Sequence, residues 1–415
     1  MREMKDSGLQ WAGDIPQYWN IAKGKHFMAV LERPVRDDDN VITCFRNGEV
    51  TLRSNRREDG FTVATVEAGY QGIEPGDLVV HGMDGFAGAI GISDSRGKGT
   101  PALNVLSCSE NKKYIMYLLR AMAYTEVFMA LSTGIRVRTC DTNWKKLKSL
   151  DYLIPPADEQ QCIADFLDAK CAEIDALVAD IQSQIDTLEQ YKRSVITETV
   201  TKGLNPNAEM KDSGIQWIGD MPAHWNGIRG KYILHYMQKP VREDDGVITC
   251  FRDGEVTLRS NRREDGFTMS DKEIGYQGID VGDLVVHGMD GFAGSIGISD
   301  SRGKASPVLN VLDTDQCKRY IMYYLRSMAY SDVFLALATG IRVRSCDLRW
   351  NKLAELSYPV PPLDEQNAIV KHIDSVLSKA DAVIADKKAQ LATLDEYKKS
   401  LIFEYVTGKK EVPAS

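Results

Sequence analysis

The stretch MKDSGLQWAGDIPQYWN at residues 4–20 returns as MKDSGIQWIGDMPAHWN at residues 210–226, which is 206 positions later. The same offset carries GEVTLRSNRREDGFT (48–62) onto residues 254–268. No insertion or deletion interrupts the correspondence over about 200 residues. A period this long exceeds that of solenoid repeats, so it indicates a duplicated domain.

Each copy opens with a globular part, residues 1–152 in the first copy and 207–358 in the second. Both parts are rich in glycine, with short apolar runs such as DLVVHG between turn residues, a pattern that predicts the strands of a mixed α+β domain. Residues 112–131 and 318–337 each predict one helix packed on the sheet.

Each copy closes with a helical part, residues 153–206 and 359–415, the second including a C-terminal tail. The helices follow Pro-Pro pairs, and we expect Asp158 and Asp364 to cap them. Apolar residues then recur at alternating steps of four and three, which is a heptad seam, with a flaw at Lys192.

Connection lengths predict how the helices run. About 40 helical residues span about 60 Å, and only residues 203–209 separate the first helix from the second globular part. To pair along its seam, the second helix must therefore run back. The expected fold class is α+β: two duplicated domains joined by an antiparallel two-helix coiled-coil spacer, with pseudo-twofold symmetry and a domain at each end.

Composition narrows the class of protein. The chain has 415 residues, of which 43% are hydrophobic and 27% charged, as in packed proteins. It contains no apolar run of about 18 residues and no apolar signal core, so no membrane segment is expected. Its eight cysteines form no CxxC pair, which favours free thiols in the cytoplasm over a metal site. The net charge is −8, and residues 158–193 and 364–399 carry −7 of it, which leaves the globular parts nearly neutral.

Two pairs of arginine-rich loops are candidates for DNA contact. Arginine suits guanine edges and phosphates, and asparagine suits adenine edges. The alternative is that these are solvated surface charges neutralised by neighbouring acids. The candidate residues are Arg53, Asn55, Arg56, Arg57, Arg136 and Arg138 in the first copy, and Arg259, Asn261, Arg262, Arg263, Arg342 and Arg344 in the second.

Other motifs favour structural roles. The glycines of DGFAGAIG (84–91) predict a hairpin turn and not a nucleotide loop, since another strand follows and no helix begins there. His81 and His287 lie in apolar strands, and Asp84 and Asp290 fit turn positions. We therefore expect no catalytic residue and no metal site.

The long helices carry apolar residues off or beside the seam, and these predict docking of partner helices. The alternative is a broader internal seam. The candidates are Phe166, Leu177, Ile196, Val376, Val383 and Ile402.

The sequence resembles the specificity subunits of type I restriction-modification systems over essentially its whole length. The resemblance rests on MKDSGIQWIGDMPAHW (210–225), on residues 282–312, on PVPPLDEQNAIVKHID (359–374) and on LDEYKKSLIFEYVTGKKEV (394–412). It implies that each globular part is a target recognition domain and that the helices are a spacer. It also implies partners: double-stranded DNA, two adenine-methylating modification subunits and two motor-nuclease restriction subunits. The chain itself would hold no cofactor, because S-adenosylmethionine, ATP and Mg²⁺ would be bound by those subunits.

The near-identity of the two copies adds a hypothesis specific to this chain. Both domains would read the same short sequence on opposite strands, so that the target is an interrupted palindrome. The alternative function is a freestanding two-headed architectural or regulatory DNA-binding protein. An enzyme acting alone ranks last.

Overall fold

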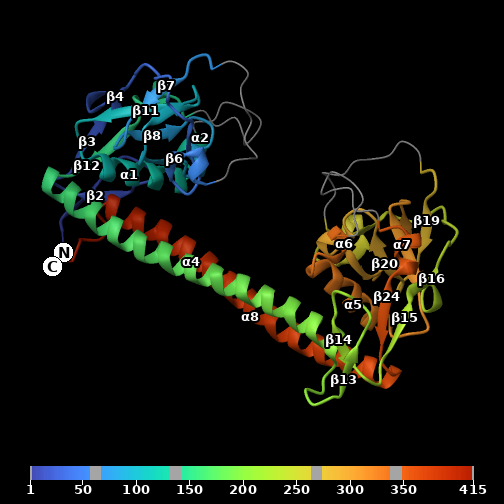
Figure 1. Ribbon diagram of the computed structural model, residues 1–415. Coiled ribbons are helices and arrows are strands. Elements are labelled where there is room, and N and C mark those ends of the chain that lie inside the picture. The colour runs from blue at the N-terminus through green and yellow to red at the C-terminus, as the bar shows by residue number, and fades with distance from the viewer. Residues whose placement is uncertain (1, 57–66, 131–141, 263–272, 337–347, 414–415) are drawn as a thin grey trace. The chain divides into compact units, whose positions relative to one another are not determined.

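The computed structural model describes residues 2–56, 67–130, 142–262, 273–336 and 348–413. They fall into two compact units, the first comprising residues 1–181 with 388–415 and the second residues 182–387. Each unit contains one globular domain and part of both long helices (Figure 1). The fold class predicted from the repeat is confirmed: two duplicated mixed α/β domains joined by long helices.

The first domain is built on a sheet of four antiparallel strands in the order β4-β11-β8-β9. Two-stranded pairs β1-β2, β3-β12, β5-β6 and β7-β10 surround it. The strands are β1 (Met4–Asp6), β2 (Asp14–Pro16), β3 (Asn20–Lys23), β4 (Met28–Val30), β5 (Ile42–Cys44), β6 (Val50–Leu52), β7 (Gln71–Ile73), β8 (Leu78–His81), β9 (Ile90–Ile92), β10 (Gly97–Gly99), β11 (Leu103–Cys108) and β12 (Asp151–Ile154).

Helix α1 (Lys112–Tyr124) packs on this sheet through ten buried residues. Its N-cap is Asn111, whose side-chain oxygen accepts hydrogen bonds from the backbone N–H groups of Lys113 and Tyr114, both at 3.0 Å. The prediction of one helix through residue 131 is wrong: α1 ends at Tyr124, and α2 (Val127–Ala130) is separate. Glu126 adopts a φ of 61°, a left-handed conformation that interrupts the helical hydrogen-bond ladder.

The remaining short elements of the first domain are helix α3 (Trp144–Leu147) and the 3₁₀ turns η1 (Gly24–His26), η2 (Arg53–Asn55) and η3 (Gly85–Ala87). The hairpin predicted for residues 84–91 is confirmed, because η3 connects β8 to its antiparallel partner β9. Gly88, at φ 91°, supplies the left-handed residue of that turn.

The second domain repeats these elements, with its four-stranded sheet in the order β16-β23-β20-β21. Its helix α5 (Lys318–Tyr330) is again separated from α6 (Val333–Ala336), here by Asp332 at φ 55°. The other elements are β13 (Met210–Asp212), β14 (Asp220–Pro222), β15 (Asn226–Arg229), η5 (Gly230–Tyr232), β16 (His235–Tyr236), β17 (Ile248–Cys250), β18 (Val256–Leu258), η6 (Arg259–Asn261), β19 (Gln277–Ile279), β20 (Leu284–His287), η7 (Gly291–Ala293), β21 (Ile296–Ile298), β22 (Gly303–Ala305), β23 (Leu309–Asp313), α7 (Trp350–Glu355) and β24 (Ser357–Val360).

The long helices are α4 (Ala157–Lys202) and α8 (Leu363–Val406). They begin one residue earlier than the caps expected at Asp158 and Asp364, which instead lie in the first turn, where acids favour the positive end of the helix dipole. In the first unit Asp175 of α4 contacts Lys398 of α8, and in the second Lys192 contacts Asp381, both at 2.6 Å.

The antiparallel seam is confirmed within each unit. Along α4 and α8 the seam positions are buried or half-buried, and their neighbours on the other faces are mostly exposed. In the first unit Leu167 and Ile174 share a hydrophobic core with Leu401, and in the second Ile196 shares one with Ile369 and Ile373. The placement of the two domains at opposite ends of a rod stays a prediction.

Two further expectations concern cysteines and membranes. The six cysteines within the described ranges are free, as predicted: Cys44, Cys108, Cys162, Cys171, Cys250 and Cys317. Of the helices that the structure describes, none has the length and apolar character needed to cross a membrane.

Candidate nucleic-acid interface

The first predicted loop emerges from the β5-β6 hairpin. The guanidinium of Arg56, just after η2, stacks over the Phe45 ring at 4.5 Å from the ring centroid. The same guanidinium forms an ion pair with the Glu49 carboxylate at 3.3 Å. In the second domain Arg262 stacks over Phe251 at 4.2 Å. Each arginine is thus held on the surface with its charge over the face of an aromatic ring.

The neighbouring candidate side chains form hydrogen bonds within the hairpin. Arg53 donates from Nε to the Thr43 hydroxyl at 3.0 Å, and Asn55 donates to the Thr51 hydroxyl at 2.8 Å. Arg259 and Asn261 repeat these bonds at 3.3 and 2.8 Å. These four side chains donate hydrogen bonds within the hairpin, whereas Arg56 and Arg262 are exposed and stack on its phenylalanine. Arg57, Arg136, Arg138, Arg263, Arg342 and Arg344 lie outside the described residues.

A second turn, between β8 and η3, lies beside this hairpin. The His81 ring accepts hydrogen bonds at Nδ1 from the backbone N–H groups of Met83 and Asp84, at 3.2 and 3.1 Å. Asp84 in turn pairs with Arg46 of the hairpin at 2.9 Å. Burial of the ring lowers the pKa of His81, so the neutral form, with its proton on Nε2, dominates at neutral pH. Histidine and aspartate have the structural roles that the sequence predicts.

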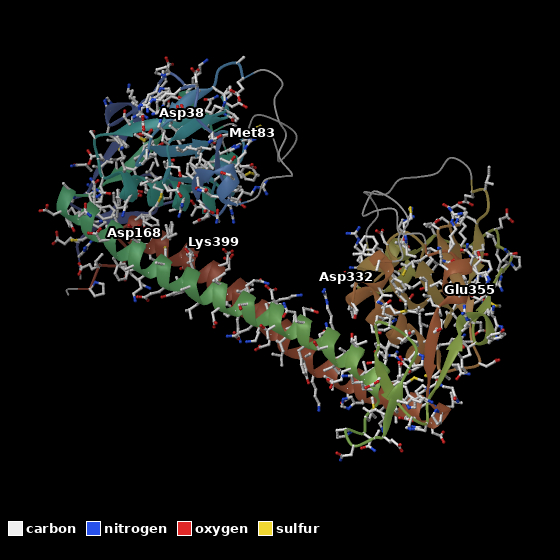
Figure 2. All side chains as sticks on the ribbon, in the orientation of Figure 1. Asp38, Met83, Asp168, Asp332, Glu355 and Lys399 are labelled. Atoms are coloured by element: carbon white, nitrogen blue, oxygen red, sulfur yellow. The ribbon has the colours of Figure 1, made fainter. Side chains whose placement is uncertain are left out.

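The rigid β8-η3 turn presents an apolar side chain to solvent. Met83 is 56% exposed, as Figure 2 shows at the surface of the first domain, and its equivalent Met289 is 53% exposed. The backbone N–H of Thr142 donates to Gly82 at 2.8 Å. The chain that follows residues 131–141 is therefore anchored at this turn, while residues 57–66 follow Arg56 directly. Thr142 is thus held by the same turn that the Arg46–Asp84 ion pair joins to the hairpin.

We call this surface the reading face; it comprises Arg46, Asn47, Arg56, Met83 and Asp84 in the first domain, and Arg252, Asp253, Arg262, Met289 and Asp290 in the second. In the second domain it contains a hollow of about 550 Å³. The residues that line the hollow are Thr249, Cys250, Phe251, Arg252, Asp253, Arg262, His287, Asp290 and Ser295. Guanidinium, imidazole, hydroxyl and carboxylate groups beside an aromatic ring can bind phosphate oxygens and base edges.

The reading face includes residues that sequence reasoning missed. Arg46 and Met83, with their equivalents Arg252 and Met289, were not among the candidates. Their signal in the sequence is the pair of short turns FRNGE and HGMDG, but only the structure shows that the Arg46–Asp84 ion pair joins the two turns.

Buried contacts hold α1 on the hairpin. Arg120 of α1 donates to the carbonyl oxygens of Ile90 at 2.8 Å and Gly48 at 3.0 Å, and it is nearly fully buried. Gly48 has a φ of 86°, and a Cβ atom there would overlap the Arg120 guanidinium. Arg326 and Gly254 repeat the arrangement in the second domain.

The predicted docking residues divide into three groups. Ile196 and Ile402 are buried in the two domain cores, so they are not available to a partner. Phe166 is half-buried against Tyr405, with 4.5 Å between ring centroids. Leu177 and Val383, which are equivalent under the repeat, are 53% and 45% exposed, and Val376 is half-buried. Docking of partner helices stays a prediction, and it now rests on the exposed residues Leu177 and Val383.

Comparison with known proteins gives relatives along nearly the whole chain. A Methanocaldococcus jannaschii protein assigned as the type I restriction enzyme MjaX specificity subunit is 24% identical, with 96% of this chain and 95% of that protein aligned. The type I restriction enzyme StySPI specificity subunit of Salmonella potsdam is 19% identical, over 96% of this chain and 90% of its own length. No family model matches the sequence.

A solved structure shares the fold. It comes from a study of complex assembly and conformational transition of the type I restriction-modification system, and it matches with a TM-score of 0.66 at 12% identity, covering 95% of this chain and 99% of that chain. Along nearly its whole length this chain is similar in sequence to specificity subunits of type I restriction enzymes, and it shares its fold with a chain from the type I restriction-modification system.

Proposed function

We propose that this chain is the non-catalytic DNA sequence-specificity subunit of a cytoplasmic type I restriction-modification complex. Each reading face contacts one half of a bipartite target, and the exposed apolar residues of α4 and α8 dock two adenine-methylating subunits. Two motor-nuclease subunits complete the complex. S-adenosylmethionine, ATP and Mg²⁺ belong to those partner subunits.

The duplication of the reading face carries this proposal. The sequence GEVTLRSNRREDGFT recurs without change at 254–268. The arginine–phenylalanine stack, the turn whose N–H groups donate to a histidine, and the Arg–Asp ion pair are present in both domains. Equal side chains in equal geometry recognise equal base sequences. We therefore propose that the two halves of the target are the same short sequence on opposite strands, an interrupted palindrome.

Methylation mapping by long-read sequencing tests the proposal in a host that expresses this chain together with the methyltransferase encoded beside it. The expected result is one methylated motif with two inverted, identical halves separated by a fixed gap. Two unrelated half-sites would reject the palindrome. If a pull-down of the full chain from its host recovers no methyltransferase, the freestanding DNA-binding protein is favoured instead.

A further inference from the structure

The two reading faces differ at two positions that adjoin the hollow. Asn47 of the first domain is replaced by Asp253 in the second, and Ala89 is replaced by Ser295. Both substitutions change what a bound DNA strand would meet, since Asp253 and Ser295 line the hollow. Because the surrounding residues are nearly identical, any difference in DNA contact between the two reading faces should arise from these two positions.

The first difference changes the charge around the stacked arginine. Among the described residues, one carboxylate lies within ion-pair distance of Arg56, that of Glu49, while Asn47 approaches it at 3.5 Å through a neutral amide oxygen. Arg262 pairs with two carboxylates, Asp253 at 2.7 Å and Glu255 at 3.2 Å. A phosphate must compete with these partners, so Arg262 offers it less net attraction than Arg56 does.

The second difference adds a hydroxyl at the hollow. Ser295 is 1% exposed, and its Oγ has no hydrogen-bond partner among the residues that the structure describes. Ala89, at the same position of the first domain, is equally buried but brings no polar atom. A buried hydroxyl without a partner costs folding free energy, so one that borders an open hollow is placed to be satisfied by an incoming polar group.

Two groups beside Ser295 define the chemistry of that hollow. His287 accepts backbone hydrogen bonds at Nδ1, so its neutral ring carries the proton on Nε2 and offers a donor. Asp290, which pairs with Arg252, offers acceptors. The hollow thus combines a neutral imidazole donor and a hydroxyl with carboxylate acceptors, groups that can hydrogen-bond the edge of a base.

We propose that the two domains hold the same half-site with contacts of unequal strength: Ser295 adds a contact to a base edge in the second domain, whereas the first gains more from the charge of Arg56 against phosphate. This inference rests on the proposed function, because it requires that both reading faces contact DNA. It makes positions 47/253 and 89/295 determinants of how strongly each half of a symmetric target is held.

Exchange of the charged position tests the first part. The full chain, with its neighbouring methyltransferase subunits, is titrated against a duplex carrying the mapped target between about 50 and 200 mM salt. Asn47→Asp should weaken binding about threefold at the low end and reduce the slope of log affinity against log salt by up to about 1. Asp253→Asn should strengthen binding and steepen the slope. Unchanged affinity in both variants, or changes of the same sign, would overturn the inference.

Removal of the hydroxyl tests the second part. Ser295→Ala should weaken binding about fivefold with no change in salt slope, because a neutral contact is lost, and thermal stability should hold or rise. A purely structural Ser295 would leave affinity unchanged. Ser299→Ala is the matched control: that buried hydroxyl donates to the Ser301 carbonyl at 2.8 Å, so its loss should lower stability and leave affinity unchanged.

The wild-type complex separates the two levels of the proposal. If it shows no preference for the mapped duplex over a scrambled one at any salt concentration, the proposed function fails, and this inference fails with it. If it binds the mapped duplex specifically while the variants at positions 47, 253 and 295 bind like the wild type, the inference alone fails.

Discussion

The base of each domain, where it joins the long helices, and the reading face of the same domain are built from opposite kinds of residue. At the base, the fully buried Tyr114 donates to the carbonyl oxygens of Leu153 and Val406, and Gln160 is almost fully buried and hydrogen-bonded to the Pro155 carbonyl. The reading face exposes arginines and a methionine. These base side chains find their hydrogen-bond partners within the chain, whereas the reading face leaves charge and apolar surface exposed to solvent.

The largest effect should come from breaking the base. Tyr320→Ala removes a fully buried ring and leaves the carbonyl oxygens of Val200 and Pro359 without their donor, which should cost about 3–5 kcal/mol of unfolding free energy. Tyr320→Phe keeps the ring and should cost about 1–2 kcal/mol. Denaturant unfolding of the full chain measures both. Equal losses for the two variants would contradict the account of the base as a packed core.

The next effect should come from the link between core and reading face. Arg120→Leu leaves the buried carbonyl oxygens of Ile90 and Gly48 without donors and should destabilise the chain by about 2–3 kcal/mol. Because Gly48 lies in the hairpin that carries Arg46, DNA affinity should fall as well. Both unfolding and DNA binding are to be measured. Lost stability with unchanged affinity would mean that α1 does not position the hairpin.

Much of this architecture could be predicted from the sequence, because a repeat without gaps and two seams constrain chain direction and pairing. The break at Glu126 could not, since apolar spacing continues through it and only its left-handed backbone ends α1. The sequence predicts docking at Ile196 and Ile402, because the seam pattern does not reveal that the helix ends enter the domain cores. The Arg46–Asp84 contact depends on two turns meeting in space, which no local pattern encodes.

On the reading face itself, a smaller effect is expected and it should appear in binding alone. Arg56→Ala should lower DNA affinity by about 1 kcal/mol or more and reduce the salt slope by about 1, with little change in stability. Arg262→Ala should do the same to a smaller extent, because Asp253 and Glu255 already pair with that arginine. Each removes a surface charge whose ring contact is exposed. Binding of the mapped duplex at several salt concentrations measures this. If neither variant alters affinity or slope, these arginines do not contact DNA.

Acid should weaken the fold through His81 and His287, which accept hydrogen bonds from the β8-η3 and β20-η7 turns. Burial lowers the pKa of His81 and His287 below their ordinary value of about 6.5, so the unfolded chain takes up these protons first. The stability they contribute is complete above about pH 6.5 and declines as pH falls toward the folded pKa values. Unfolding at pH 7 and pH 5.5 should show a smaller acid loss in a His81→Asn, His287→Asn double variant. The exposed His372→Gln is the control and should follow the wild type.

The smallest effect should come from the long helices, where polar residues interrupt an apolar seam. Lys192 occupies a seam position and pairs with Glu189 at 3.0 Å and Asp381 at 2.6 Å, but Asp381 is largely exposed. Exposed ion pairs contribute about 0–1 kcal/mol, so Lys192→Leu should change unfolding free energy by less than about 1 kcal/mol, in either direction. Lys192→Asp, which places like charges together, is the destabilising control. A loss above about 2 kcal/mol for Lys192→Leu would mean that the ion pair fixes the register of α4 against α8. The charge of Lys192 would then set the register of the two helices, so that the seam, like the reading face, would depend on polar side chains for its specificity.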